Sequence, residues 1–355
     1  MNRISLLTAV MVTLMGCMQD KAGMINNTGI NERKFIDSTD MTNNFYDNTE
    51  TFSLPVKDLI IEGEVANPGK VDFSKLTKHS VIVKETVLDS AGGDKFTGAF
   101  RYDGYSLFDI LENIVIKKKN TGEFSSIIDL YIEVENEAGE KVDFSWGEIY
   151  YPNNLHKILI ASDVSRIVPS KTKELWILPE KSRIIAATDL ITERNISDPV
   201  RINVKSYPRS FATIKGMSPM YSPVITVFNQ SVRIGEITKI QDQVQNETFN
   251  TIFYGRGKGI HSTAPFTGPM VKEMLKEYFP VSRENLQKGV MCFTGKDGYR
   301  CVVSYSELFN RNDQQEFLMI KSAPGEDGGL FRMFPASDFF SDRAIKSLSE
   351  IHLTY

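Results

Sequence analysis

Apolar residues along the chain follow two kinds of spacing, which together predict many strands and few helices. Two stretches carry apolar residues at the i, i+3, i+4 and i+7 spacing of one helical face. These residues are Leu107, Ile110, Leu111 and Ile114 in the first stretch, and Val271, Met274, Leu275 and Tyr278 in the second. Most other apolar runs are short and bounded by polar residues, as in DLIIEGEV (58–65) and PVITVFNQSV (223–232). Such runs are typical of strands, so the pattern predicts an α+β fold that is mostly β.

The same blocks of sequence occur twice, in the same order. The matching segments are 102–114 with 266–278, 133–160 with 292–319, and 193–204 with 342–353. Identical residues in matching positions include Ser145 and Ser304, Glu148 and Glu307, and Arg194 and Arg343. An internal duplication is therefore predicted, and a chain of 355 residues has room for two cores. We place the two tandem domains at residues 54–206 and 222–355, joined by a linker at residues 207–221.

The first residues predict export and attachment to a membrane. One basic residue, Arg3, precedes an apolar run that ends at Met15 and is shorter than the roughly 20 residues needed to span a bilayer, which fits a signal peptide. The run leads into LMGC, which resembles the lipobox of bacterial lipoproteins and implies lipidation of Cys17. An ordinary secretory signal is the alternative. We therefore expect a signal peptide at residues 1–17, a disordered tether at residues 18–53, and a body on the periplasmic side or the cell surface.

The other two cysteines, Cys292 and Cys301, flank a predicted β-hairpin and are candidates for a disulfide. If Lys296 and Asp297 form the turn, the two cysteines face each other across the strands. Export permits their oxidation. If Asp297 and Gly298 form the turn instead, the register shifts and the cysteines remain two buried thiols.

A glycine-rich stretch before the second predicted helix, YGRGKGIHSTAPFTG (254–268), alternates glycines with basic residues. Glycines let the backbone approach a ligand and present successive N–H groups, while basic side chains add positive charge. The candidate anion- or cofactor-binding residues are Arg256, Lys258, His261, Gly255, Gly257 and Gly259. The alternative is a flexible connection between a strand and a helix, because the spacing does not match a P-loop.

The order of motifs in each half resembles that of the sulfite-oxidase-type molybdopterin-binding domain. The stretches that carry the resemblance are LIIEGEVANPGKVDFSKL (59–76), YDGYSLFDIL (102–111), LWILP (175–179), FTGPMVKEML (266–275), GKDGYRCVVSYSEL (295–308) and FRMFP (331–335). The resemblance implies this fold for both halves and makes molybdopterin the cofactor to consider. In that family a cysteine thiolate in the loop after the second strand ligates molybdenum. The matching stretches, 88–104 and 254–268, contain no cysteine, and only Ser90 or Ser262 could offer an oxygen there.

Other polar residues give weaker signals. The four histidines, His79, His156, His261 and His352, show no metal-ligand spacing, so no metal site is predicted. We expect His156 to be an ordinary polar position. Glu148 and Glu307 occupy equivalent positions in the two halves, so we expect them to lie in different domains and not to act as an acid–base pair.

These features favour a membrane-anchored binding module without catalytic activity, which holds an anionic small ligand or a protein partner. A net charge of −4 gives no reason to expect nucleic acid. One alternative is a molybdopterin-dependent oxidoreductase with an atypical metal site. Another is a purely structural surface lipoprotein.

Overall fold

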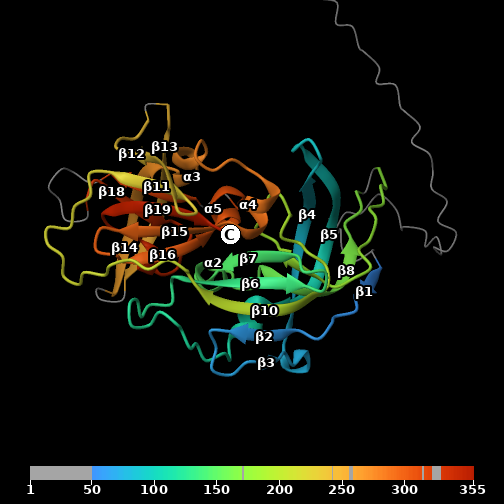
Figure 1. Ribbon diagram of the computed structural model, residues 1–355. Coiled ribbons are helices and arrows are strands. Elements are labelled where there is room, and N and C mark those ends of the chain that lie inside the picture. The colour runs from blue at the N-terminus through green and yellow to red at the C-terminus, as the bar shows by residue number, and fades with distance from the viewer. Residues whose placement is uncertain (1–49, 170–171, 242, 256–258, 314–315, 322–328) are drawn as a thin grey trace, which may run out of the picture. The chain divides into compact units, whose positions relative to one another are not determined.

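The computed structural model describes residues 50–355, apart from residues 170–171, 242, 256–258, 314–315 and 322–328. The described residues form nineteen β-strands and five α-helices, and the longest helix has 6 residues (Figure 1). The prediction of a mostly β chain is therefore confirmed. All of these residues belong to one compact unit.

A five-stranded sheet lies in the N-terminal half, residues 54–206. Its strands in order are β3 (Gly69–Lys70), β2 (Ile60–Gly63), β10 (Pro199–Ser206), β6 (Leu130–Asn136) and β7 (Lys141–Ser145). The middle strand, β10, runs parallel to β2 and antiparallel to β6. Its alternating apolar residues Ile202 and Val204 are fully buried, as the period of a strand requires.

The C-terminal half, residues 222–355, contains a sheet with the same arrangement. Its strands in order are β12 (Val232–Ile237), β11 (Ile225–Asn229), β19 (Leu348–Thr354), β15 (Val290–Gly295) and β16 (Arg300–Ser304). The middle strand, β19, runs parallel to β11 and antiparallel to β15. In each half, the last strand in the sequence therefore lies in the middle of the sheet. On one side it pairs with β2 or β11, and on the other side with the hairpin β6–β7 or β15–β16.

Each half also has a long hairpin before its first α-helix. The hairpin strands are β4 (Lys78–Leu88) and β5 (Asp94–Ser106) in the N-terminal half, and β13 (Asn246–Gly255) and β14 (Gly259–Pro269) in the C-terminal half. The remaining strands are β1 (Thr51–Ser53), β8 (Ile158–Arg166), β9 (Arg183–Ala186), β17 (Phe317–Lys321) and β18 (Phe331–Pro335). β8 pairs with β5, β1 and β9, and β17 pairs with β18.

Two predictions about loops are corrected by these strands. The predicted tether at residues 18–53 ends in β1, because Thr51–Ser53 hydrogen-bond with β8; residues 18–49 lie outside the described residues. The stretch 88–104 is not a loop throughout, because a tight turn is followed there by strand β5. Alternate residues of β5, such as Phe100 and Tyr102, are buried, as is typical of a strand.

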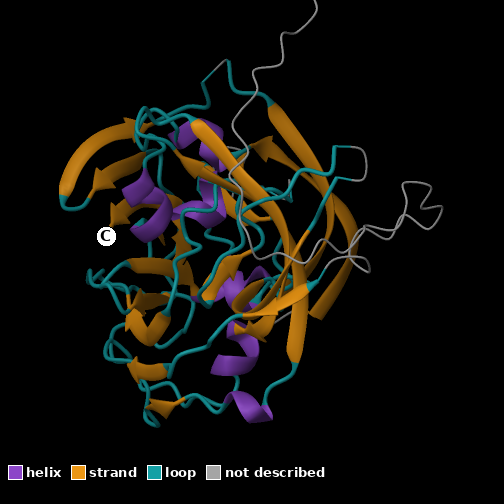
Figure 2. Cartoon of the chain, turned by 90° about the vertical axis from the view of Figure 1, so that its right-hand side faces the viewer, coloured by secondary structure: helices purple, strands orange, loops and turns teal. Residues whose placement is uncertain are grey.

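The α-helices are single turns that follow strands or turns, and Figure 2 shows them in purple among the strands. They are α1 (Leu107–Leu111), α2 (Trp146–Tyr150), α3 (Val271–Leu275), α4 (Arg283–Lys288) and α5 (Tyr305–Phe309), with 3-10 turns at Phe73–Lys75 and Ser341–Arg343. The predicted apolar faces of α1 and α3 are buried. A serine caps four of these helices, and its side-chain oxygen accepts a backbone N–H of the first turn.

The predicted linker, residues 207–221, forms no helix or strand, but it is not detached from the body. Tyr207 is buried, and with Phe211 it packs against Val290, Cys292 and Val302 of β15 and β16. The linker therefore contributes to the packing of the C-terminal sheet.

The predicted disulfide is wrong in this structure, because the hairpin has a longer turn than expected. Cys292 pairs with Val302, and Phe293 pairs with Cys301. The two cysteines are therefore one position out of register and point to opposite faces of the sheet, since a strand alternates its faces residue by residue. Both are buried free thiols.

Candidate functional site

Most of the glycine-rich stretch that was predicted to bind an anion is a strand, because residues 259–268 lie in β14. Gly255 pairs with Gly259 at the end of the two strands. Arg256, Gly257 and Lys258 lie outside the described residues, and His261 is within β14, where its side chain is not described. The predicted strand-to-helix loop is therefore corrected to a hairpin, because residues 259–269 pair with β13.

The best-defined polar site lies where the two halves meet. In this site, each half donates a hydrogen bond to a matching residue of the other half. Arg194 of the N-terminal half donates to the hydroxyl of Ser304, with 3.1 Å between Nη1 and Oγ. Arg343 of the C-terminal half donates to the hydroxyl of Ser145, at 3.3 Å. Each half therefore places its arginine on the serine that caps a helix of the other half, α5 or α2.

Main-chain groups near the arginines also form one hydrogen bond in each direction between the halves. The N–H of Leu190 donates to the carbonyl of Asn310, and the N–H of Phe339 donates to the carbonyl of Tyr151, both at 2.7 Å. Contacts in which each partner makes the same bond to the other are typical of a two-fold interface.

Arg194 is fully buried and is held by two acids of its own half. Its Nη2 lies 2.7 Å from Asp189 Oδ1, and its Nη1 lies 3.0 Å from Glu148 Oε1. Burial alone would lower the pKa of Arg194, but the two carboxylates raise it above its usual value. Burial raises the pKa values of Glu148 and Asp189 above their usual range, and the attraction of Arg194 offsets this only in part.

Arg343 occupies the matching place in the C-terminal half. Its Nη2 lies 2.6 Å from Glu307 Oε1 and 2.7 Å from Asp338 Oδ1. Burial raises the pKa of Asp338 to about 6, although Arg343 acts to lower it. The guanidinium packs against Gly147 of α2, where an added Cβ would lie 2.2 Å from Arg343 Cζ, so a side chain at that position would clash.

We call these eight residues the reciprocal network. They are Ser145, Glu148, Asp189 and Arg194 in the N-terminal half, and Ser304, Glu307, Asp338 and Arg343 in the C-terminal half. Glu148 and Glu307 lie in different halves, but they are not remote from each other, because Ser145 donates to Glu307 Oε2 at 2.6 Å and accepts the N–H of Glu148 at 2.9 Å. The two glutamates therefore belong to one network.

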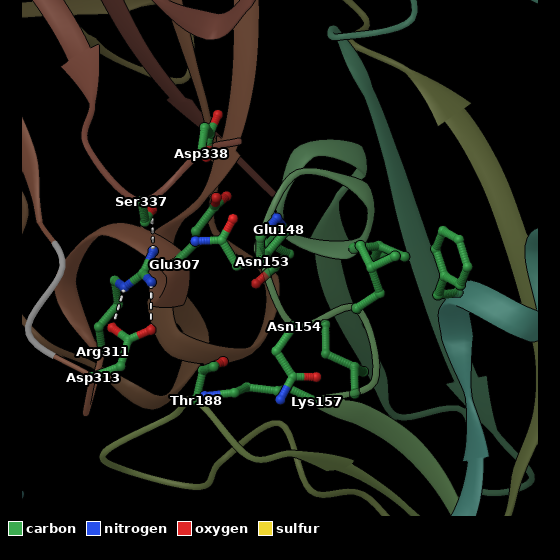
Figure 3. Close-up of a pocket in the computed structure, with 15 residues that line it drawn as sticks. Glu148, Asn153, Asn154, Lys157, Thr188, Glu307, Arg311, Asp313, Ser337 and Asp338 are labelled. Atoms are coloured by element: carbon green, nitrogen blue, oxygen red, sulfur yellow. Dashed lines mark hydrogen bonds and ion pairs between the residues drawn. The ribbon is translucent and has the colours of Figure 1, made fainter. Parts of the chain in front are cut away.

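A cleft with a volume of about 250 Å³ opens beside the reciprocal network (Figure 3). Glu148, Glu307 and Asp338 line it together with residues of both halves. Arg311 forms a two-pronged ion pair with Asp313 and also donates to Ser337 at 3.1 Å. The acids and the arginine at this end of the cleft are therefore already paired within the protein.

Other residues that line the cleft carry polar groups with fewer partners. Lys157 lines the cleft and, among the described residues, its ammonium group forms no ion pair or hydrogen bond. Asn153 and Thr188 add an amide and a hydroxyl group, and Phe108 and Leu155 add apolar surface. Together these residues can offer an anionic group one cation and neutral hydrogen-bonding groups.

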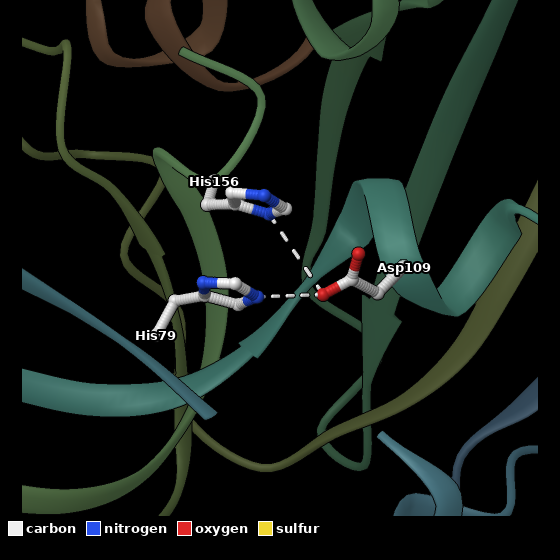
Figure 4. Close-up of side chains that lie close together, drawn as sticks. All are labelled: His79, Asp109 and His156. Atoms are coloured by element: carbon white, nitrogen blue, oxygen red, sulfur yellow. Dashed lines mark hydrogen bonds and ion pairs between the residues drawn. The ribbon is translucent and has the colours of Figure 1, made fainter. Parts of the chain in front are cut away.

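Three side chains that are distant in sequence lie close together (Figure 4), and one of them, His156, contacts Phe108, which lines the cleft. His79 Nε2 lies 2.8 Å from Asp109 Oδ2, and His156 Nδ1 lies 3.8 Å from the same oxygen. The two imidazole rings stack with 3.7 Å between their centroids. No motif spacing pointed to this cluster, because its members are separated by thirty residues or more. His156 is therefore part of a cluster and not an ordinary polar position.

The remaining candidates are not near the cleft. His352 is buried in β19, where it stacks on Phe228 and contacts Glu350. Ser90 is exposed in the turn between β4 and β5. Cys17 lies outside the described residues, and so does the side chain of Ser262.

Comparison with models of protein families finds no family that matches the chain, and a search of curated proteins finds no match either. In the described part of the chain, no helix has the length and apolar character needed to cross a membrane.

Proposed function

We propose that this chain is an exported lipoprotein, anchored through Cys17, whose two halves are sulfite-oxidase-like domains produced by an internal duplication. In this proposal the body binds a small anionic ligand and carries out no redox chemistry. The observation that carries the binding proposal is the cleft between the halves, where Lys157 has no partner among the described residues.

Two features of the structure support the duplication. The two five-stranded sheets have the same strand order and the same parallel and antiparallel pairings. Two glycines also approach the backbone of a neighbouring strand in the same way: a Cβ on Gly104 would meet the carbonyl oxygen of Ile160, and a Cβ on Gly268 would meet that of Met319. These residues fall in segments that match in the sequence, which supports the proposed duplication.

The donor groups of the described residues do not fit a molybdenum centre of the family's kind. Such a centre needs a thiolate, and neither Cys292 nor Cys301 lines the cleft. Burial raises the pKa of Cys292 to about 12 and that of Cys301 well above its usual value, so both remain protonated thiols. This chemistry supports a binding module over an oxidoreductase, and we assign no redox step.

The ligand chemistry follows from the residues of the cleft that have fewer partners. Lys157 supplies one positive charge, while the amide of Asn153 and the hydroxyl of Thr188 supply neutral hydrogen bonds. Phe108 and Leu155 cover an apolar part. A small carboxylate or phosphate compound with a short apolar portion fits this combination.

Calorimetric titration with succinate and with inorganic phosphate tests the proposal. We expect one of these probes to bind the wild type, and Lys157→Glu to weaken binding by at least about 10-fold, because a charge-assisted hydrogen bond is replaced by repulsion. Lys84→Glu is the matched control, because Lys84 is an exposed lysine of β4 that does not line the cleft. Equal binding by both variants, or no binding by the wild type, would count against the cleft as the anion site.

A further inference from the structure

The cluster of His79, Asp109 and His156 brings together three groups that ligate metals, from three separate segments. His79 lies in β4, Asp109 lies in α1, and His156 lies in the loop that leads into β8. Their potential ligand atoms all lie within 4.8 Å of one another. Figure 4 shows both imidazole rings directed toward the same carboxylate.

The separations are close to those of a metal site. In a tetrahedral site with metal–ligand bonds of about 2.0–2.2 Å, neighbouring ligand atoms lie about 3.3–3.5 Å apart. The two histidine nitrogens lie 2.8 and 3.8 Å from Asp109 Oδ2, one below and one above that range. The rings are now parallel, so both must tilt toward a shared ion. Their partial exposure, 24% for His79 and 34% for His156, leaves room for that change.

Neighbouring residues position two of the three groups. The hydroxyl of Ser106 accepts the backbone N–H of Asp109 at 3.1 Å. It also lies 3.0 Å from Nδ1 of His156, and this contact must be given up when that nitrogen binds an ion. The ring of Phe108 packs edge-on against His156, with 5.9 Å between the ring centroids. The bond to the Asp109 backbone and the packing of the His156 ring orient these two residues before an ion binds.

We propose that His79, Asp109 and His156 form a binding site for Zn²⁺. Two imidazoles and one carboxylate are a typical ligand set for this ion, whereas Mg²⁺ and Ca²⁺ prefer sites made only of oxygen. All three side chains are partly exposed, so a fourth position remains open to water or to a ligand. The proposal does not depend on anion binding in the cleft, although Phe108 contacts the cluster and also lines the cleft.

The first test is titration of the metal-free full-length chain with Zn²⁺ and, separately, with Mg²⁺. We expect one Zn²⁺ per chain and much weaker binding of Mg²⁺. His79→Gln, His156→Gln and Asp109→Asn should each weaken Zn²⁺ binding by at least about 100-fold, because losing a ligand costs more than losing a supporting contact. Glu112→Gln is the matched control, because Glu112 is an exposed carboxylate at the end of the same helix, α1, and should leave the affinity unchanged.

Co²⁺ provides a second measurement that does not depend on the folding of a variant. A site with two nitrogens, one carboxylate and an open position should give the strong visible absorption of four-coordinate Co²⁺ in the wild type. Unchanged Zn²⁺ affinity in all three variants would overturn the proposal. Weak absorption typical of six-coordinate aqueous Co²⁺ would overturn it as well.

Discussion

Replacement of Arg343 by methionine should strongly destabilise the protein, because it removes the cation shared by two buried acids. The Arg343 side chain is 1% exposed, and its partners Glu307 and Asp338 are each 2% exposed. Removing one partner of a buried ion pair costs about 3–5 kcal/mol, because the remaining charge stays buried without a partner. We therefore expect Arg343→Met to lower the free energy of unfolding by about 3–5 kcal/mol at pH 7. The loss should be smaller at pH 5, where Asp338 can take up a proton.

Urea unfolding followed by circular dichroism measures this free energy by linear extrapolation. Arg201→Met is the matched control: Arg201 is 39% exposed and also pairs with two acids, Glu62 and Glu135. Pairs of this kind contribute only about 0–1 kcal/mol, because water screens them. If Arg343→Met destabilised the protein no more than Arg201→Met, the reasoning about the reciprocal network would be refuted. Adding Glu307→Gln and Asp338→Asn to Arg343→Met should restore much of the loss, since no buried charge is then left unpaired.

Two further predictions concern pH and the membrane. The pKa of Asp338 is raised from 3.8 to about 6, so the folded state binds this proton more tightly than the unfolded state does. Protonated Asp338 therefore contributes stability at pH 4 that is lost as the pH rises to 7. Relative to Asp338→Asn, the wild type should lose about 2 kcal/mol over that interval in urea unfolding, and a constant difference would contradict this. For the proposed lipid anchor, Cys17→Ala should abolish incorporation of labelled palmitate and move the exported protein from the membrane fraction to the soluble fraction. Met18→Ala is the control and should do neither. A Cys17→Ala protein that stays in the membrane fraction would refute lipidation at Cys17.

The local elements could be predicted from sequence because they depend on residues that are close in the chain. The apolar face of α1 is buried at Leu107 and Leu111, as its spacing indicates. The hairpin formed by β15 and β16 also forms as predicted. The register of this hairpin could not be decided from sequence, because several turns are possible around Asp297 and each gives a different set of residue pairs across the strands. A shift of one position separates Cys292 from Cys301.

The site could not be predicted in the same way, because it depends on packing between distant segments. His79, Asp109 and His156 have no motif spacing, and only the pairing of β4 with β5 and of β5 with β8 brings their segments together. Glu148 and Glu307 each follow a serine that caps a helix, α2 or α5. Their matching positions in the two halves were taken to mean separation, but similar surfaces that pack against each other bring matching residues together near the axis between them.

The proposed duplication, together with the proposed binding cleft, predicts a single anion site. In the matching positions of the two halves, the residues of the reciprocal network are identical in type, because an exchange of equal contacts needs the same groups on both sides. Glu148 and Glu307 line the cleft from matching positions, so two fully equal halves would give one cleft with two equal ends. Other lining residues differ: Lys157 corresponds to Glu316, which pairs with Lys272, and Arg311 corresponds to Pro152. Among the described lining residues, Lys157 therefore has no matching cation in the other half, so the chain should bind one anion, and titration should give a stoichiometry of one per chain.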